Sequence, residues 1–148
     1  MSAEGQEGQV AELLAREAIK ELRYEFSHLG DIVDGELRAD EMVALFTQDA
    51  RFEVGGAAVQ GHAAIREQLV TGAAPFARVM HIMTNPILKV AGNEASGRWA
   101  GIFPLVFQGS DRPVWLSYYA FDQYRKVDGR WLFSSIRTAP TIIPPEFK

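Results

Sequence analysis

The chain has 148 residues, which lets one domain bury roughly 68–70% of its unfolded surface and leaves no room for a second domain. Its 15 Lys and Arg against 19 Asp and Glu give a net charge of −4, and the charges are scattered, so the basic footprint of a nucleic-acid-binding protein is missing. Apolar residues make up 47% of the chain, which argues against disorder. We therefore expect one folded domain over residues 1–148 and no nucleic-acid partner.

Cysteine is absent, so disulfides, thiolate nucleophiles and cysteine metal ligands are excluded. The first ten residues carry no basic cluster or apolar run, and no stretch approaches the roughly 20 apolar residues that span a bilayer. We therefore expect a cytoplasmic protein with no membrane partner. Residues 1–8 are small and polar, which predicts a loose leader ahead of the fold.

The first half of the sequence predicts three helices. From Val10 to about Leu29, apolar residues recur at steps of three and four until Gly30, the pattern of an amphipathic helix. Similar spacing predicts a second helix from about Arg38 to Phe46 and a third from Gly61 to Val70, with a strand from Ala50 to Val54 between them.

The second half predicts an antiparallel meander. Four long stretches are rich in aromatic and β-branched residues and are separated by short turns: 78–90, 94–108, 113–126 and 130–139. Pro104, within the second stretch, marks a strand edge or a bulge. The segment from Thr138 to Lys148, proline-rich over 140–148, is expected to leave the sheet and fold across a pocket or reach a neighbouring subunit.

This order of elements predicts an α+β fold. Helices that precede a run of long strands pack on one face of a sheet, here a strongly curved, mixed and mainly antiparallel sheet that forms a cone-shaped barrel. The open end of such a cone is a pocket. The chain lacks the short motifs of nucleotide binding, zinc binding and nucleophilic catalysis, and its three histidines form no metal-ligand cluster, so we expect no cofactor and no metal.

His81 is the first candidate for chemistry. It lies in an apolar strand whose alternation places Val79, His81, Met83 and Asn85 on one face, a mixture of apolar and polar groups that suits a pocket wall. A packed, hydrogen-bonded core histidine would give the same pattern. Asp31, after Gly30, could be a capping residue or a carboxylate that orients His81 as a general base.

Other candidates are aromatic or basic. Tyr24 and His28 share a helix stripe with charged residues, which favours solvent exposure, whereas Phe26 faces inward. Trp99, Tyr118 and Tyr119 could be core residues or substrate contacts. Each of two arginines lies in an apolar strand: Arg98 is expected to face outward, and Arg137 to hold a substrate oxyanion or to pair with Asp31.

Five segments carry a family resemblance: AIKELRYEFSHLGDIVD, LFTQDARFEV, GHAAI, MHIMTNPIL and YRKVDGRWLFSSI. They resemble, over about residues 10 to 140, the SnoaL-like branch of the nuclear-transport-factor-2-like superfamily, the branch of scytalone dehydratase, bile-acid 7α-dehydratase and hexachlorocyclohexane dehydrochlorinase. The resemblance implies a cone-shaped domain, and many members are dimers or trimers. Its catalytic aspartate and histidine correspond to Asp31 and His81, and an arginine of its last strand to Arg137, whereas a tyrosine near the aspartate finds Phe26 or Gly30 here.

The resemblance implies a cofactor-independent lyase. His81 would remove a proton, Asp31 would orient its imidazole, and water, halide or formaldehyde would leave, with Arg137 or a tyrosine stabilising charge. The substrate is expected to be small and apolar, aromatic or polycyclic, with contacts to one set of residues: Tyr24, Phe26, Tyr118, Tyr119, Trp99 and Met83. Two alternatives stay open, a ketosteroid-isomerase-like isomerase and a non-catalytic ligand-binding domain. A homo-oligomer, trimer or dimer, is expected.

Overall fold

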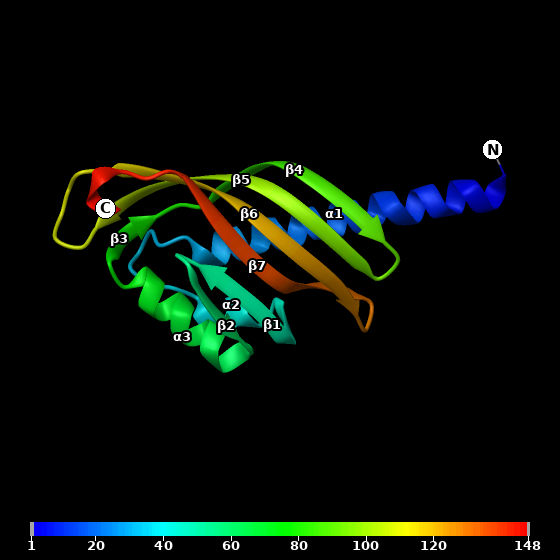
Figure 1. Cartoon of the computed structure of the whole chain (residues 1–148), viewed down its shortest axis with the longest axis horizontal. Helices are drawn as coiled ribbons and strands as arrows, with labels where there is room; N and C mark the ends of the chain where they lie inside the picture. Colours follow the sequence, from blue (N-terminus) through cyan, green and yellow to red (C-terminus); the bar gives the residue numbers. More distant parts are fainter. Residues whose placement is uncertain (1, 148) are drawn as a thin grey trace.

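Within residues 2–147, which the computed structural model describes, seven strands form one sheet that curls around three helices (Figure 1). The helices are α1 (Ala3–Gly30), α2 (Ala39–Val43) and α3 (His62–Ala73), and a short 3-10 helix η1 (Pro145–Phe147) follows the last strand. The strands are β1 (Phe46–Val54), β2 (Ala57–Gln60), β3 (Phe76–Val79), β4 (Ile82–Ala91), β5 (Glu94–Phe107), β6 (Val114–Val127) and β7 (Arg130–Ile142).

The sheet is mixed and mainly antiparallel. Its order is β2-β1-β7-β6-β5-β3, and β4 pairs with β5 beside β3. Strands β4 to β7 form an antiparallel meander, and β1 pairs with β7 in parallel. The α+β cone expected from the order of elements is therefore confirmed.

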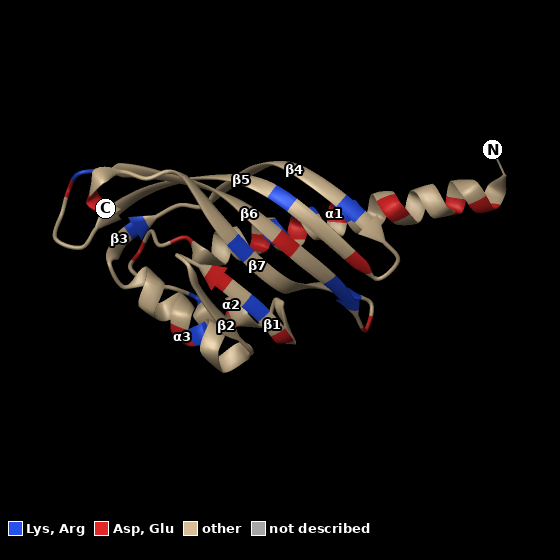
Figure 2. Cartoon of the chain, viewed as in Figure 1, with Lys and Arg blue, Asp and Glu red and all other residues tan. Residues whose placement is uncertain are grey.

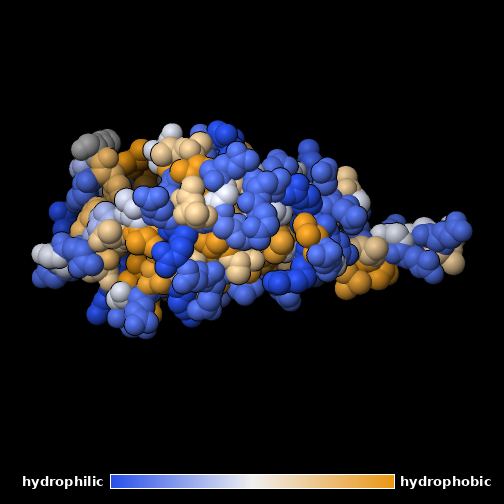
Figure 3. Space-filling view, turned by 90° about the horizontal axis from the view of Figure 1, so that it is seen from below, coloured by the Kyte–Doolittle hydropathy of each residue, from blue (hydrophilic) through white to orange (hydrophobic). Residues whose placement is uncertain are grey.

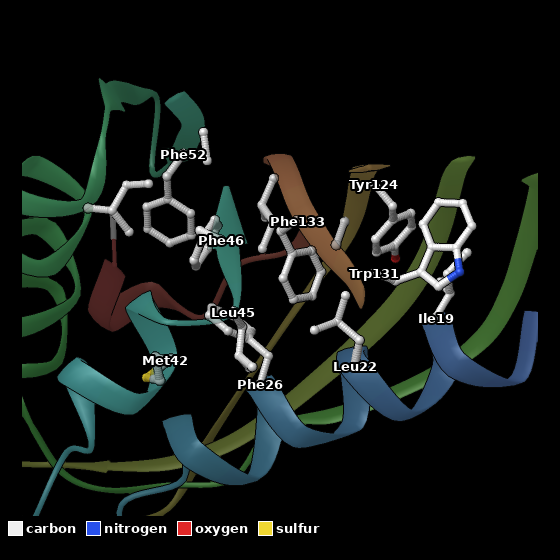
Figure 4. Packing of buried hydrophobic residues seen from close by; sticks show 14 of the residues in the cluster. Ile19, Leu22, Phe26, Met42, Leu45, Phe46, Phe52, Tyr124, Trp131 and Phe133 are labelled. Carbon is white, nitrogen blue, oxygen red and sulfur yellow. The ribbon is translucent and has the colours of Figure 1, made fainter. Parts of the chain in front are cut away.

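The core forms where α1 crosses the concave face of the sheet. Ile19, Leu22 and Phe26 recur at helical spacing and are buried, and Phe26 meets the ring of Phe133 edge-on at 5.3 Å (Figure 4). Aromatic side chains fill the space between α1 and the strands, because a curved sheet leaves a wedge that large rings can occupy.

The N-terminal half of α1 projects from the body (Figure 1). The helix begins at Ala3, where the hydroxyl of Ser2 accepts a hydrogen bond from the N–H of Gly5 at 3.2 Å, an N-cap. The loose leader predicted over residues 1–8 is therefore wrong for the described residues. Gly5 and Gly8 lower the helix propensity of this segment by about 1 kcal/mol each. The N-cap and the growth of the helix from its C-terminal turns, which pack on the sheet, outweigh that cost.

Two element boundaries differ from the sequence prediction. The second helix ends at Val43 rather than Phe46, because Phe46 starts β1 and pairs with Phe133 of β7. The stretch predicted as one strand over 78–90 is two, β3 and β4, interrupted at Met80 and His81. Pro104 lies opposite this interruption and pairs with Trp115 of β6 without a register shift, so the predicted strand edge or bulge is wrong; the interruption of the neighbouring strand is what lets β5 do without this N–H donor.

The end of the sheet also differs. Strand β7 continues to Ile142, and Pro140 pairs with Tyr118 of β6, so the segment from Thr138 does not leave the sheet at once as predicted. Beyond it, Ile143 and Phe147 turn back over the pocket, as expected. Lys148 lies outside the described residues.

Charged residues spread over the surface without a single basic face, and the projecting part of α1 carries acidic ones (Figure 2). Apolar side chains gather where α1 leaves the body, among them Val10, Leu13 and Leu14, each more than half exposed (Figure 3). No helix among residues 2–147 is both long enough and apolar enough to cross a membrane.

Candidate functional site

A cavity of about 480 Å³ lies between the helices and the concave face of the sheet. Its wall is mostly apolar, with contributions from α1, α3, five strands and the C-terminal segment. An apolar hollow opens near the C-terminal end of the molecule (Figure 3). A few polar side chains interrupt the wall, namely Arg23, Gln68, His81, Tyr118 and Thr138. An apolar cavity of this size with few polar groups suits a small organic ligand.

Asp31 and His81 meet at the cavity wall. The backbone N–H of His81 donates to Oδ1 of Asp31 at 2.6 Å, and Nδ1 of the His81 ring lies 3.2 Å from the same oxygen. An ionised carboxylate only accepts hydrogen bonds, so we assign the ring proton to Nδ1. Nε2 then carries a free lone pair. The two side chains retain 26% and 18% exposure, so a ligand in the cavity can reach the ring.

Two local features hold this pair together. Asp31 caps the C-terminus of α1, and its neighbour Ile32 exchanges two backbone hydrogen bonds with Val79, at 2.9 and 3.0 Å. This bridge ties the end of α1 to the β3–β4 interruption where His81 sits. A Cβ on Gly30 would lie 3.2 Å from Cε1 of His81, so glycine makes room there for the close approach of the ring and is not needed for an unusual backbone angle.

An aromatic row continues from His81 along the wall. The His81 ring meets Phe103 edge-on at 5.2 Å, and Phe103 stacks on Tyr118 at 4.0 Å. Burial raises the pKa of Tyr118 well above its usual 10.0; the charge of Arg23 lowers that pKa and the charge of Asp122 raises it, both by less. The Tyr118 hydroxyl therefore stays protonated and can serve as a hydrogen-bond donor on the cavity wall.

A buried polar network, absent from the sequence prediction, lies behind the wall. Nε of Arg23 is 3.3 Å from Oδ2 of Asp122, and both side chains are 3% exposed or less. The same oxygen accepts a hydrogen bond from the Tyr124 hydroxyl at 2.7 Å, which in turn accepts one from Nε1 of Trp99 at 2.9 Å. Burial is the main cause that raises the pKa of Asp122, and Arg23 opposes it.

The sequence did contain a signal for this network. Arg23 lies on the buried stripe of α1 with Ile19 and Phe26, and Asp122 lies on the buried face of β6 with Ala120 and Tyr124. Charged residues on two apolar faces that must pack together indicate a buried ion pair.

The structure brings two of the six expected substrate contacts, Phe26 and Tyr118, to the cavity. The other four do not line it. Trp99 is fully buried behind the wall. The exposed Tyr24 covers it, and the two rings meet edge-on with their centres 5.8 Å apart. Tyr119 faces outward because it follows the inward-facing Tyr118 in a strand, and Met83 packs into the core beside Phe103.

Arg137 does not reach the cavity or Asp31. Its neighbours Ile136 and Thr138 line the cavity, so alternation turns Arg137 to the outer face, where its guanidinium lies 4.4 Å from the centre of the Phe121 ring. Arg98 faces outward as expected and lies over Tyr119. Arg137 therefore supplies no charge to the cavity.

A second concavity, about 780 Å³ and open to solvent, lies between α2, β1, the start of α3 and the β6–β7 hairpin. Its lining includes Asp49, which pairs with Arg125, and His62, whose Nε2 lies 2.9 Å from the carbonyl of Phe46. These groups are already partnered. Among residues 2–147, no three His, Cys, Asp or Glu side chains converge as metal ligands.

The chain is an α+β domain whose curved mixed sheet encloses an apolar cavity with its helices. Residues 11–137 match the family model of the SnoaL-like domain. The chain belongs to the SnoaL-like family. No curated protein sequence matches it.

Solved structures share the fold. The "Putative Scytalone Dehydratase" of Novosphingobium aromaticivorans is 22% identical, with 90% of this chain and 89% of that chain covered and a TM-score of 0.80. A "Putative Aromatic Ring Hydroxylase" of the same organism is 26% identical over 86% and 90%, with a TM-score of 0.76. A hexachlorocyclohexane dehydrochlorinase (LinA, Type2) is 17% identical over 93% and 98%, also with a TM-score of 0.76. Other similar structures are of unknown function.

Proposed function

We propose that the chain is a lyase that eliminates water, halide or formaldehyde from a small apolar, aromatic or polycyclic substrate with His81 as general base. The observation that carries this proposal is the 3.2 Å approach of Nδ1 of His81 to Asp31 on the wall of an apolar cavity. Dehydratase and dehydrochlorinase names among the structures that share the fold support an elimination.

The geometry gives each group a role. For loss of water or halide, Nε2 of His81 accepts a proton from substrate carbon, the electrons of the broken C–H bond form the new double bond, and the neighbouring carbon–oxygen or carbon–halogen bond breaks; halide leaves as the anion, and a departing hydroxide takes the proton back from the His81 imidazolium to leave as water. For loss of formaldehyde, Nε2 accepts the proton of a hydroxymethyl O–H, the electrons of that bond form the C=O of formaldehyde, and the carbon–carbon bond breaks with its electrons left on the substrate carbon, which takes the proton back from the imidazolium. Asp31 stabilises the imidazolium that results, because its carboxylate then faces a cation. Tyr118 donates a hydrogen bond to developing negative charge but, since burial raises its pKa, transfers no proton readily.

Ketosteroid-isomerase-like isomerisation is the alternative that the cavity also favours, because the Tyr118 hydroxyl could stabilise an enolate. The two reactions share the base and differ in the fate of the proton. An isomerase returns it to another substrate carbon, whereas a lyase releases a leaving group that can be measured.

The test is turnover of hydroxylated and halogenated aromatic compounds, with no metal or cofactor added. Ultraviolet absorbance would report new conjugation, and chromatography would report any released halide or formaldehyde. Wild type should turn over at least one compound, and Asp31→Asn and His81→Ala should lose that turnover while they keep the wild-type unfolding temperature. Ligand binding that raises the unfolding temperature, without turnover of any compound, would favour the non-catalytic domain. Conjugation that shifts position without a released group would favour the isomerase.

A further inference from the structure

Arg23 lines the cavity, and its ion pair with Asp122 lacks a hydrogen bond. It lies in the middle of α1 with a side chain 3% exposed, yet it forms part of the cavity wall. Among the described residues, its Nε has no hydrogen-bond acceptor, and Oδ1 of its partner Asp122 has no donor. Burial without hydrogen bonds is costly for a charged group. The pair is therefore incomplete as a purely structural ion pair.

The surroundings explain why Asp122 does not satisfy Arg23. Oδ2 of Asp122 is already hydrogen-bonded to the Tyr124 hydroxyl at 2.7 Å, and the 3.3 Å separation from Nε lacks hydrogen-bond geometry. The guanidinium lies 5.6 Å from the ring centres of Phe26 and Phe133. These rings attract the cation but provide no conventional hydrogen-bond acceptor. A guanidinium has five N–H donors, and because Arg23 lines the cavity, a ligand there can supply acceptors for them.

We propose that Arg23 is the oxygen-binding residue of this cavity, so that its ligand is an apolar ring compound that carries one carboxylate, phenolate or carbonyl oxygen. This inference rests on the proposed function in that it names the substrate class of the same cavity. It also supplies the cation that Arg137 does not provide. Arginine binds such oxygens through two parallel N–H groups, which fixes ligand orientation as well as affinity.

The network behind the wall suits this role. The hydrogen bond that Oδ2 of Asp122 accepts comes from the Tyr124 hydroxyl and not from Arg23, so the network leaves the Nε donor of Arg23 unused. Where the ligand oxygen is a carbonyl, proton removal by His81 delocalises the electron pair onto that oxygen, and Arg23 then binds an enolate. The positioning residue and the base would act on opposite ends of one conjugated system.

The experiment compares three probes of similar shape: naphthoate, acetylnaphthalene and ethylnaphthalene, which carry an anionic oxygen, a carbonyl and no oxygen. Equilibrium dialysis against wild type should give naphthoate an affinity at least about tenfold above that of ethylnaphthalene, because hydrogen bonds to charged groups are the strong ones. Arg23→Met, close in volume but neutral, should bring the three affinities within about threefold. Arg23→Lys should keep the preference for naphthoate at lower affinity, since it keeps the charge without the fork.

Folding is checked by the unfolding temperature of each variant. If Arg23→Met alone does not fold, the double variant Arg23→Met with Asp122→Asn removes both buried charges and serves in its place. Wild type without preference for naphthoate, or a folded neutral variant that retains it, would overturn the assignment. His81→Gln separates this inference from the proposed function: it should abolish turnover and keep the preference, and the preference can be measured even if no compound is turned over.

Discussion

Gly30→Ala should disturb the candidate base without touching a ligand. The new Cβ would lie 3.2 Å from Cε1 of His81, 3.2 Å from Cε of Met42 and 3.4 Å from Nδ1 of His81, closer than Cβ atoms usually approach, so the ring and the Met42 methyl group must each move by a few tenths of an ångström. Asp31 follows Gly30 in the chain, so a ring that moves away from Gly30 also moves away from Oδ1. That separation is 3.2 Å and would approach about 3.6 Å, where a hydrogen bond is lost.

Two quantities should change. Turnover should fall roughly tenfold, because a misplacement of 1 Å can cost about a hundredfold and this one is smaller. Long-range ¹⁵N correlation spectra report the tautomer of each neutral histidine without any substrate. Wild-type His81, identified by its loss in His81→Gln, should carry its proton on Nδ1, and Gly30→Ala should show a mixture of both tautomers.

Gly72→Ala is the matched control. Gly72 is also helical and also lines the cavity, but a Cβ there would meet nothing within 4 Å. It should leave the His81 tautomer unchanged and raise stability by about 0.5–1 kcal/mol through helix propensity. An unchanged tautomer in Gly30→Ala, or an equal change in Gly72→Ala, would refute the argument that Gly30 makes room for an oriented imidazole.

Further predictions concern the buried network, the N-terminus and assembly. Burial raises the pKa of Asp122 above its usual 3.8, so the folded chain binds this proton more tightly than the unfolded chain, and the stability it contributes is present below pH 3.8 and lost as pH rises. Urea unfolding should therefore show wild type losing stability relative to Asp122→Asn between pH 4 and the raised pKa; a gap independent of pH would contradict this. Trp99→Phe should destabilise by about 2 kcal/mol in the same assay, because it leaves the Tyr124 hydroxyl without its donor and opens a void. Deletion of residues 1–9 should leave the unfolding temperature within about 1 °C, since the described residues there are all exposed. The expected dimer or trimer stays a prediction, which sedimentation equilibrium would check.

The sequence could predict the individual members of the Asp31–His81 pair but not their contact. A helix that ends at a glycine and a strand with one polar residue on an apolar face are both local patterns. Their contact joins positions 50 residues apart and depends on the Ile32–Val79 bridge. The family resemblance supplied that connection, because related chains share the fold that creates it.

The strand residues show where pattern stops being sufficient. The alternation of side chains along a strand predicts that Tyr118 and Tyr119 lie on opposite faces of the sheet, as do Arg137 and its neighbours in the chain. It does not predict which face borders the cavity. In the structure, Ile136 and Thr138 of β7 line the cavity, so Arg137 between them lies on the outer face of the sheet. An apolar outer face conceals this phase, because residues such as Trp115 make both sides of the sheet look like core.

Arg23 escaped prediction for a different physical reason. A long basic side chain on an apolar stripe usually extends along the helix until its charge reaches water. Arg23 has no such route, because the turns on either side of it are packed against β7 through Leu22 and Phe26. Its burial therefore depends on Asp122, almost a hundred residues later, and neither charge alone would be stable there. This buried ion pair borders an open cavity and lacks hydrogen bonds. A ligand that supplies the missing hydrogen bonds explains its presence better than a contribution to stability does.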